Sequence, residues 1–196
     1  ILSERGHSIV ENIITFPLLL PIIISGCGFT ISIISIIGLL LFLLFSHRFE
    51  YHYVWQHSNT AMQMKYILSC LWEGQEGSFM LWALWHAILG VILMFTTKKW
   101  ESPIMAVFAI TQVFLMSMLL GLWVGDVKIG SNPFALLRDT MDAPIFSNPN
   151  YLSFIKDGNG LNPLLKNYWM TIHPPTLFLG FSSTLIPFAF VIASLW

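Results

Sequence analysis

Among the side chains of this 196-residue chain, those of its six histidines are best suited to binding a transition metal. The most distinctive of them is His173, which stands directly before Pro174 and Pro175. A residue before proline is disfavoured in the α conformation, so we predict that a helix ends at His173 and holds its imidazole at a break in the backbone. Neutral imidazole is a common ligand of transition metals. On spacing alone, a ligand role and a structural role for His173 both remain open.

The other candidate ligands form no recognisable motif. His47, His52 and His57 recur every five residues, a spacing that suits neither one face of a helix nor one face of a strand. We therefore favour solvated or interfacial histidines over a joint metal site. Cys27 and Cys70 belong to no zinc-finger or C-x-x-C-H spacing, and a disulfide between them cannot be inferred.

His86 lies in the middle of an apolar stretch, where an ionisable side chain is costly and often functional. The alternative is structural, because a neutral imidazole can form a hydrogen bond with Thr111 or Gln112 of the next apolar stretch. We favour the structural interpretation of His86.

The composition places these residues in a membrane protein. Hydrophobic residues make up 56% of the chain and charged residues 10%, whereas soluble domains average roughly 25% charged residues. The charges are also segregated, which leaves charge-free stretches at 12–47, 77–97, 102–125 and 167–196. Because a spanning helix needs about 20 apolar residues, these stretches predict an integral membrane protein. A net charge of −1 gives no basic footprint for a nucleic-acid partner.

We expect an all-α integral membrane protein with about four transmembrane helices in a single membrane domain, residues 1–196. The predicted spans are about 22–46, 78–97, 103–125 and 175–196. Prolines at 17 and 21 interrupt an apolar lead-in at 15–21, so the first region is either one span or the remainder of a two-span hairpin.

Lys98 and Lys99 predict the orientation of the chain in the membrane. They lie in a short connection between two predicted spans, and short basic loops stay in the cytoplasm. Residues 47–77 and 126–174 then become two extracytoplasmic segments. Because the chain begins with Ile1 and has no signal-peptide pattern, we interpret it as a fragment of a larger protein.

Each outer segment is predicted to contain a short interfacial helix. Residues 61–72 have apolar positions at helical spacing, and a second helix is expected between Asn162-Pro163 and His173. The turn at 72–78, Trp-Glu-Gly-Gln-Glu-Gly-Ser, is interpreted as a capped helix entrance in preference to the acidic rim of a cofactor or partner site.

Two blocks of sequence resemble a known family. YVWQHSNTAMQMKYILSCLWEGQEGSFMLW (53–82) and NPFALLRDTM followed by DGNGLNPLLKNYWMTIHPPTLFLGF (132–181) are similar to the N-terminal part of the CcmF/CcsA-like family. Members are cytochrome c-type biogenesis haem lyases or haem-handling proteins. The similarity covers roughly residues 48–196, and the motifs occur in the same order as in the family.

The resemblance implies a multi-pass protein of the bacterial inner (cytoplasmic) membrane. Such a protein takes haem b from a haem carrier at the outer face for covalent attachment to apocytochrome c, together with other cytochrome c maturation subunits. It also implies that His173 is an axial ligand of the haem iron, paired with a second outer-face histidine across a tryptophan-rich segment. The resemblance implies no catalytic residue in this chain.

The departures from the family pattern limit these expectations. The tryptophan-rich segment, the second outer histidine and the family's membrane histidines would lie beyond Trp196, so we expect the parent to be a haem lyase and this chain alone to be inactive. Glu73 and Gln75 stand where many relatives have Gly and His, and we assign no haem contact there.

Two alternative functions remain. A cytochrome b-like respiratory subunit needs paired histidines on spanning helices, and only His86 qualifies. A cofactor-free transporter or structural membrane module needs none. A tryptophan-rich segment shortly downstream would favour the haem lyase over both.

Overall fold

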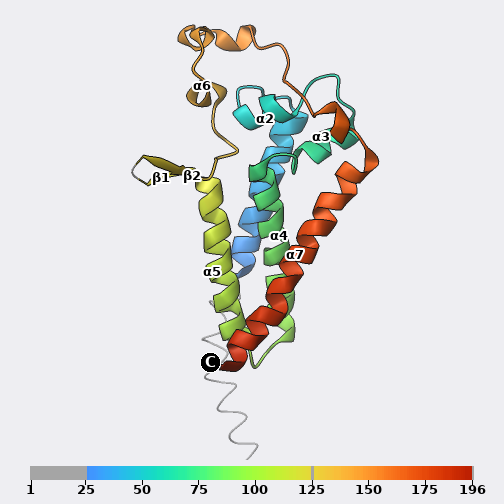
Figure 1. Cartoon of the computed structure of the whole chain (residues 1–196), viewed down its shortest axis with the longest axis vertical. Helices are drawn as coiled ribbons and strands as arrows, with labels where there is room; N and C mark the ends of the chain where they lie inside the picture. The colour runs from blue at the N-terminus through green and yellow to red at the C-terminus, as the bar shows by residue number, and fades with distance from the viewer. Residues whose placement is uncertain (1–25, 125, 196) are drawn as a thin grey trace, which may run out of the picture.

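A computed structural model describes residues 26–124 and 126–195 of the chain. Four of its helices are long and apolar enough to cross a membrane, which confirms the predicted all-α membrane fold (Figure 1). These are the first helix, Gly26–Phe45, then α4 (Gln75–Thr96), α5 (Glu101–Leu120) and α7 (Tyr168–Leu195). The apolar lead-in predicted at 15–21 lies outside the described residues.

Helix α4 is the centre of the bundle. Its most apolar window is 44% buried, against 17% for α7, because the other spanning helices pack around it. The first helix contributes Ile33, Ile37, Leu40 and Leu44 to the core, at the spacing of one helical face, while its opposite side is exposed. A second cluster joins Leu93 of α4, Phe108 of α5 and the small residues Ala189 and Ala193 of α7. Small side chains let neighbouring membrane helices approach closely.

Helix α7 continues through Pro174 and Pro175, so the prediction that a helix ends at His173 is wrong. The helix begins at Tyr168, well before the start at 175 that we expected for the last span. Proline removes a backbone donor, but membrane helices tolerate it where neighbouring groups satisfy the freed carbonyls. Here indole N–H groups from outside α7 bond to carbonyls on either side of His173.

The connecting segments gather at two opposite ends of the bundle (Figure 1). Among the described residues, one end holds only the short connection from α4 to α5, at 97–100. The other end, which we call the outer end, holds the short helices that the structure describes: α2 (His52–His57), α3 (Met64–Cys70), α6 (Leu137–Thr140) and the 3₁₀ helices η1 (Pro144–Ser147), η2 (Tyr151–Ser153) and η3 (Pro163–Leu165).

A short antiparallel hairpin follows α5. Strand β1 (Leu122–Val124) pairs with β2 (Val127–Ile129), so the helix that we expected to reach residue 125 ends at Leu120. Gly121 has a φ of 63°, a left-handed conformation that terminates helices. The strands that follow are rich in valine, a strand-favouring residue.

The predicted interfacial helices are shorter than expected. Helix α3 covers Met64–Cys70 instead of 61–72, and Met64, one of the apolar positions at helical spacing, is 69% exposed. Its buried side is formed by Ile67, Ser69 and Cys70. After Asn162, the chain forms the 3₁₀ turn η3, where the Asn162 side chain accepts a hydrogen bond from the Leu164 amide at 3.0 Å. Residues 168–173 of the expected helix are the first part of α7.

Candidate functional site

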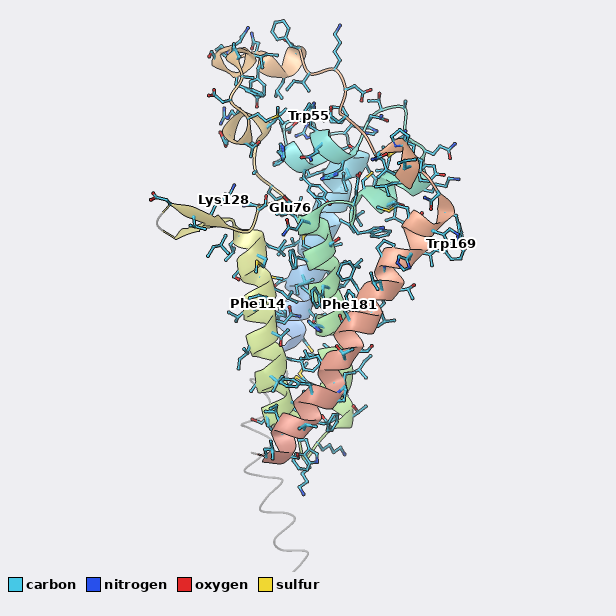
Figure 2. The ribbon with its side chains drawn as sticks, viewed as in Figure 1. Trp55, Glu76, Phe114, Lys128, Trp169 and Phe181 are labelled. Atoms are coloured by element: carbon cyan, nitrogen blue, oxygen red, sulfur yellow. The ribbon has the colours of Figure 1, made fainter. Side chains whose placement is uncertain are left out.

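His173 lies on the second turn of α7, at the outer end, and its side chain is exposed. Trp169 precedes it by four residues and therefore shares its face of the helix. Trp169 and the neighbouring Tyr168 are 69% and 68% exposed, with their rings 5.7 Å apart. Figure 2 shows Trp169 at the outer end of α7. The structure thus presents an exposed imidazole on the same helix face as an exposed tryptophan.

Phe178, which follows His173 on α7, faces the bundle. Its ring centroid lies 5.9 Å from that of Trp82 on α4 and 6.0 Å from that of Phe181. Phe178 is therefore part of the contact between α4 and α7. Trp169 is the exposed aromatic residue that shares the helix face of His173, and Tyr168 packs against Trp169.

The beginning of α7 is bonded to the first outer segment and to α4 by side chains that sequence reasoning missed. Each bond reaches the chain within a few residues of His173. They are Tyr66 Oη to Lys166 O (3.2 Å), Ser69 Oγ to Thr171 Oγ1 (2.9 Å), Trp72 Nε1 to Met170 O (2.8 Å) and Trp85 Nε1 to Pro175 O (3.0 Å). The sequence held a signal for the Trp72 bond alone, because Pro174 within a helix leaves the Met170 carbonyl without its backbone donor.

The two outer segments are joined at Asp157. Its carboxylate accepts hydrogen bonds from the Thr60 amide (2.8 Å) and the Thr60 hydroxyl (3.1 Å). The bond from the Thr60 backbone is the main reason that the pKa of Asp157 lies below its ordinary value. Gly158 packs directly against this loop, where an added Cβ would overlap the carbonyls of Ser58 and Trp55. These contacts explain why the Ser-Asn-Thr and Asp-Gly-Asn-Gly sequences occur together.

A second junction uses the Asn-Pro-Phe-Ala-Leu segment. Tyr51 and Leu136 form an antiparallel bridge, in which the His52 amide donates to Ala135 O (2.9 Å) and the Leu137 amide donates to Glu50 O (2.8 Å). Both outer segments therefore form one unit at the outer end of the bundle.

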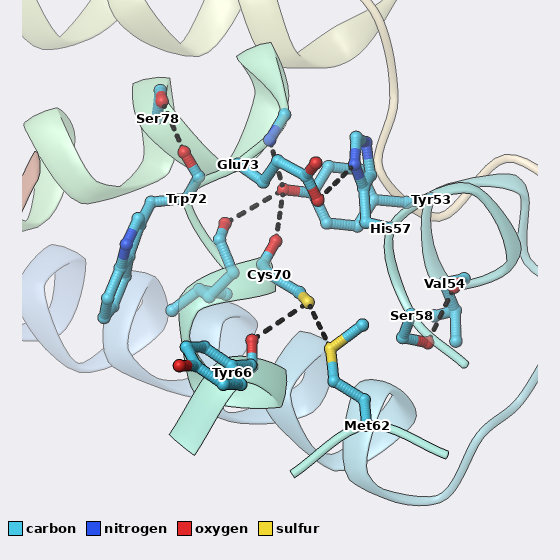
Figure 3. A network of polar contacts seen from close by, with 12 residues as sticks. Tyr53, Val54, His57, Ser58, Met62, Tyr66, Cys70, Trp72, Glu73 and Ser78 are labelled. Carbon is cyan, nitrogen blue, oxygen red and sulfur yellow. Dashed lines mark hydrogen bonds and ion pairs between the residues drawn. The ribbon is translucent and has the colours of Figure 1, made fainter. Parts of the chain in front are cut away.

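Tyr53 organises the turn between α3 and α4 (Figure 3). Its hydroxyl lies 3.0 Å from the carbonyl oxygens of both Cys70 and Leu71 and accepts a bond from the Gly74 amide at 3.3 Å. Burial raises the pKa of Tyr53, so the hydroxyl remains a donor. A Cβ on Gly77 would overlap Leu71 O and the Tyr53 hydroxyl, which explains this glycine.

The acidic residues of this turn are engaged within the protein. Glu73 Oε2 lies 3.0 Å from His57 Nδ1, with both side chains largely buried, and Glu76 occupies the first turn of α4. The expected cap differs in detail, because Gly74 is the N-cap residue and the Ser78 hydroxyl donates to Trp72 O at 3.0 Å. The turn therefore begins α4 without the side-chain cap that we expected.

The remaining histidines and cysteines form no common metal site among the described residues. Burial lowers the pKa of His52, and burial raises the pKa of the Cys70 thiol to about 12. The Cys70 thiol donates to Tyr66 O at 3.0 Å. Among residues 26–124 and 126–195, no group of three or more His, Cys, Asp or Glu side chains is arranged to hold a metal ion.

His86 is buried in α4 at the edge of a cavity of about 920 Å³ between the first helix, α4 and α5. The hydrogen bonds that we predicted for it are wrong. The Thr111 hydroxyl donates to Val107 O, and the Gln112 amide donates to Ala83 O at 2.9 Å. The His86 Nδ1 atom has no hydrogen-bond partner within the described part of the chain.

Comparison with known proteins defines the class to which this outer assembly and its membrane bundle belong. A family model described as cytochrome C assembly protein matches residues 72–196, which include α4, α5, the second outer segment and α7. The chain belongs to this cytochrome c assembly family, as the resemblance of its motifs predicts.

The similar proteins include three named cytochrome c-type biogenesis protein CcmF. The one from Pseudomonas fluorescens is 31% identical over 162 residues, which are 81% of this chain and 21% of the relative. The one from Haemophilus influenzae is 30% identical over 167 residues (83% and 22%), and that from Pseudomonas aeruginosa is 34% identical over 151 residues (75% and 20%). The chain thus spans about a fifth of the length of these relatives. No solved structure matches it significantly.

Proposed function

We propose that this chain handles haem b at the outer face of the bacterial inner (cytoplasmic) membrane, as part of a protein that delivers the haem for covalent attachment to apocytochrome c. The family match and the CcmF relatives support a role in cytochrome c assembly. His173 is the proposed axial ligand of the haem iron. Haem is the cargo in this proposal.

The observation that supports this role most directly is the exposed imidazole of His173 beside Trp169, on a helix turn whose backbone is bonded to neighbouring elements. Neutral imidazole is well suited to an axial position on haem iron. Exposed aromatic side chains can cover the apolar face or edge of a porphyrin. The protein's contribution is to present the ligand and to shield one side of the cargo.

The parent protein is proposed to be a cytochrome c haem lyase that acts with a haem carrier, apocytochrome c and other maturation subunits in the membrane. The chain spans about a fifth of its CcmF relatives. The second axial ligand and the apocytochrome site are therefore assigned to other parts of the parent, and the chain alone is proposed to be inactive.

Substitution of His173 in the full-length parent tests this proposal. We expect His173→Ala to abolish cytochrome c maturation while the protein remains in the membrane, because an exposed side chain leaves no cavity behind. Added imidazole should partly restore maturation by occupying the vacated coordination position. The measurement is haem-stained holocytochrome c against the membrane level of the variant.

His173→Gln and His86→Gln complete the test. Glutamine offers hydrogen-bonding groups without an imidazole ligand, so His173→Gln should fail as His173→Ala does. Normal maturation in His173→Gln would contradict the ligand role. His86→Gln, which changes a buried histidine elsewhere, should retain most of the activity.

A further inference from the structure

We infer that Trp72 and Trp85 are positioning residues for His173: their indole N–H groups hold the His173 turn, residues 170–175 of α7, from both sides of the histidine. This inference rests on the proposed ligand role of His173 for its functional consequence. The hydrogen bonds themselves stand independently of that role.

The first bond replaces one that proline removes. In a regular helix, the amide of residue 174 would donate to the carbonyl of Met170, but Pro174 has no N–H. The Trp72 indole donates to this carbonyl at 2.8 Å, a short and therefore favourable N–H···O distance. Trp72 thus fills a vacancy that the sequence of α7 itself creates, three residues before His173.

The second bond lies on the other side of the histidine. The Trp85 indole, from the middle of α4, donates to the carbonyl of Pro175 at 3.0 Å. Between the two tryptophan bonds, Ser69 Oγ lies 2.9 Å from Thr171 Oγ1. Bonds before and after His173 restrict rotation of the turn about the α7 axis, and this rotation decides the direction in which the exposed imidazole projects.

Trp82 provides a matched comparison on the same helix. Its ring packs on Phe178 and Phe181 of α7, with centroids 5.9 and 5.8 Å away, so it contributes to the same helix contact. Its Nε1 atom, however, is buried and has no hydrogen-bond partner among the described residues. Removal of the indole N–H should therefore affect positions 72 and 85 and leave position 82 unaffected.

The first experiment measures the position of the turn without haem. In the full-length parent in lipid nanodiscs, a nitroxide label is attached at His173→Cys and its mobility is measured by electron paramagnetic resonance. We expect Trp72→Phe and Trp85→Phe to increase this mobility by about twofold or more, because each phenylalanine keeps an aromatic ring and loses the donor. Trp82→Phe should match the parent. Unchanged mobility in both Trp72→Phe and Trp85→Phe would overturn the inference.

If a phenylalanine variant is produced at a low level, an isosteric analogue of tryptophan can replace it in the same test. Benzothienylalanine at position 72 or 85 has nearly the shape of tryptophan but no N–H group, so it removes only the hydrogen bond. Increased mobility with this residue supports the inference. Parent-like mobility with it at both positions, at normal protein level, contradicts the inference.

The second experiment links the turn to haem. With His173 intact, Trp72→Phe and Trp85→Phe should lower maturation several-fold and shift the low-spin electron paramagnetic resonance signal of bound haem, which depends on the orientation of the imidazole planes. Added imidazole should restore part of the maturation. A shift in label mobility with an unchanged haem signal in these variants would leave the turn contacts correct and refute their role in ligand positioning. If His173→Ala retains the haem signal, the proposed function fails, and the mobility measurement still decides the contacts.

Discussion

The addition of a single methyl group at Gly77 should have a large structural effect. A methyl group there would overlap the Leu71 carbonyl and the Tyr53 hydroxyl, and a backbone carbonyl cannot move aside as a flexible side chain can. We expect Gly77→Ala to lower the free energy of unfolding by about 1 to 3 kcal/mol, the usual cost of overpacking. Thermal unfolding of the purified full-length parent in detergent measures this loss.

Gly180→Ala is the control for this prediction. An added Cβ at Gly180 meets no atom within 4 Å, and alanine is the better helix former, so stability should stay equal or rise slightly. If Gly77→Ala unfolds at the parent's temperature, the close packing of the turn between α3 and α4 is refuted.

The chemical type of the site residues could be predicted from the sequence, whereas their surroundings could not. His173 was identifiable from its prolines and from the family resemblance, and it is exposed at the outer end. The direction of Phe178 depends on helix contacts that no local pattern records. Likewise, the partner of Glu73 is His57, which lies 16 residues earlier, on the other side of α3.

At the scale of elements, the helices α4 and α5 were predictable because charge-free stretches of spanning length leave few alternatives. The residues at which the elements begin and end were less predictable. The conformation before proline disfavours a helix at His173, yet outside donors such as Trp72 compensate for the missing N–H group. The end of α5 depends on the left-handed conformation of Gly121, a preference that competes with a continuing apolar run.

The junction between the two outer segments should depend on the charge of Asp157. The hydrogen bonds from Thr60 hold its pKa below the ordinary value of 3.8, so the ionised form is stabilised in the folded state. This contribution is fully present above pH 3.8 and is lost as the pH falls through the lowered pKa. We expect Asp157→Asn to speed hydrogen exchange at residues 57–62 several-fold at neutral pH, because the amide is a weaker acceptor than the carboxylate.

Thr60→Ala is the milder comparison for the same junction. It removes the hydroxyl bond of 3.1 Å and keeps the amide bond of 2.8 Å, so it should have the smaller effect. In Asp157→Asn the difference between acidic and neutral pH should also shrink. Equal exchange in the parent and in Asp157→Asn would show that the loop packing around Gly158 holds the junction without the carboxylate.

At the scale of the whole molecule, the outer end is proposed to face away from the cytoplasm. The segment between α6 and α7, which contains residues 148 and 159, lies at the end of the bundle opposite the connection between α4 and α5 (Figure 1). In intact cells, single cysteines at Asn148 and Asn159 should react with a membrane-impermeant maleimide, and one at Lys99 should react only after permeabilisation. All three positions are exposed, so burial does not account for a difference. Labelling at 99 with protection at 148 would reverse the orientation and remove the outer-face role of His173.

The architecture as a whole also has one part that could be predicted from the sequence and one part that could not. Composition and charge segregation suffice for a four-helix membrane bundle, because both follow from the cost of placing charge in hydrocarbon. The joining of the two outer segments requires contacts such as that of Thr60 with Asp157, between residues 97 positions apart. Such contacts are set by the three-dimensional arrangement of the spans, which a single sequence does not encode in any local pattern.

The distance along the chain between Thr60 and Asp157 also determines the order in which parts of the protein can assemble during biosynthesis. Thr60 leaves the ribosome 97 residues before Asp157, and α4 and α5 must enter the membrane between them. Until then, the amide and hydroxyl of Thr60 are hydrated at the membrane surface without their final partner. The loop of Asp157 emerges just before α7, so closure of the outer end coincides with the arrival of the helix that bears His173. A nascent chain stalled after α5 would therefore hold its spans without an assembled outer end.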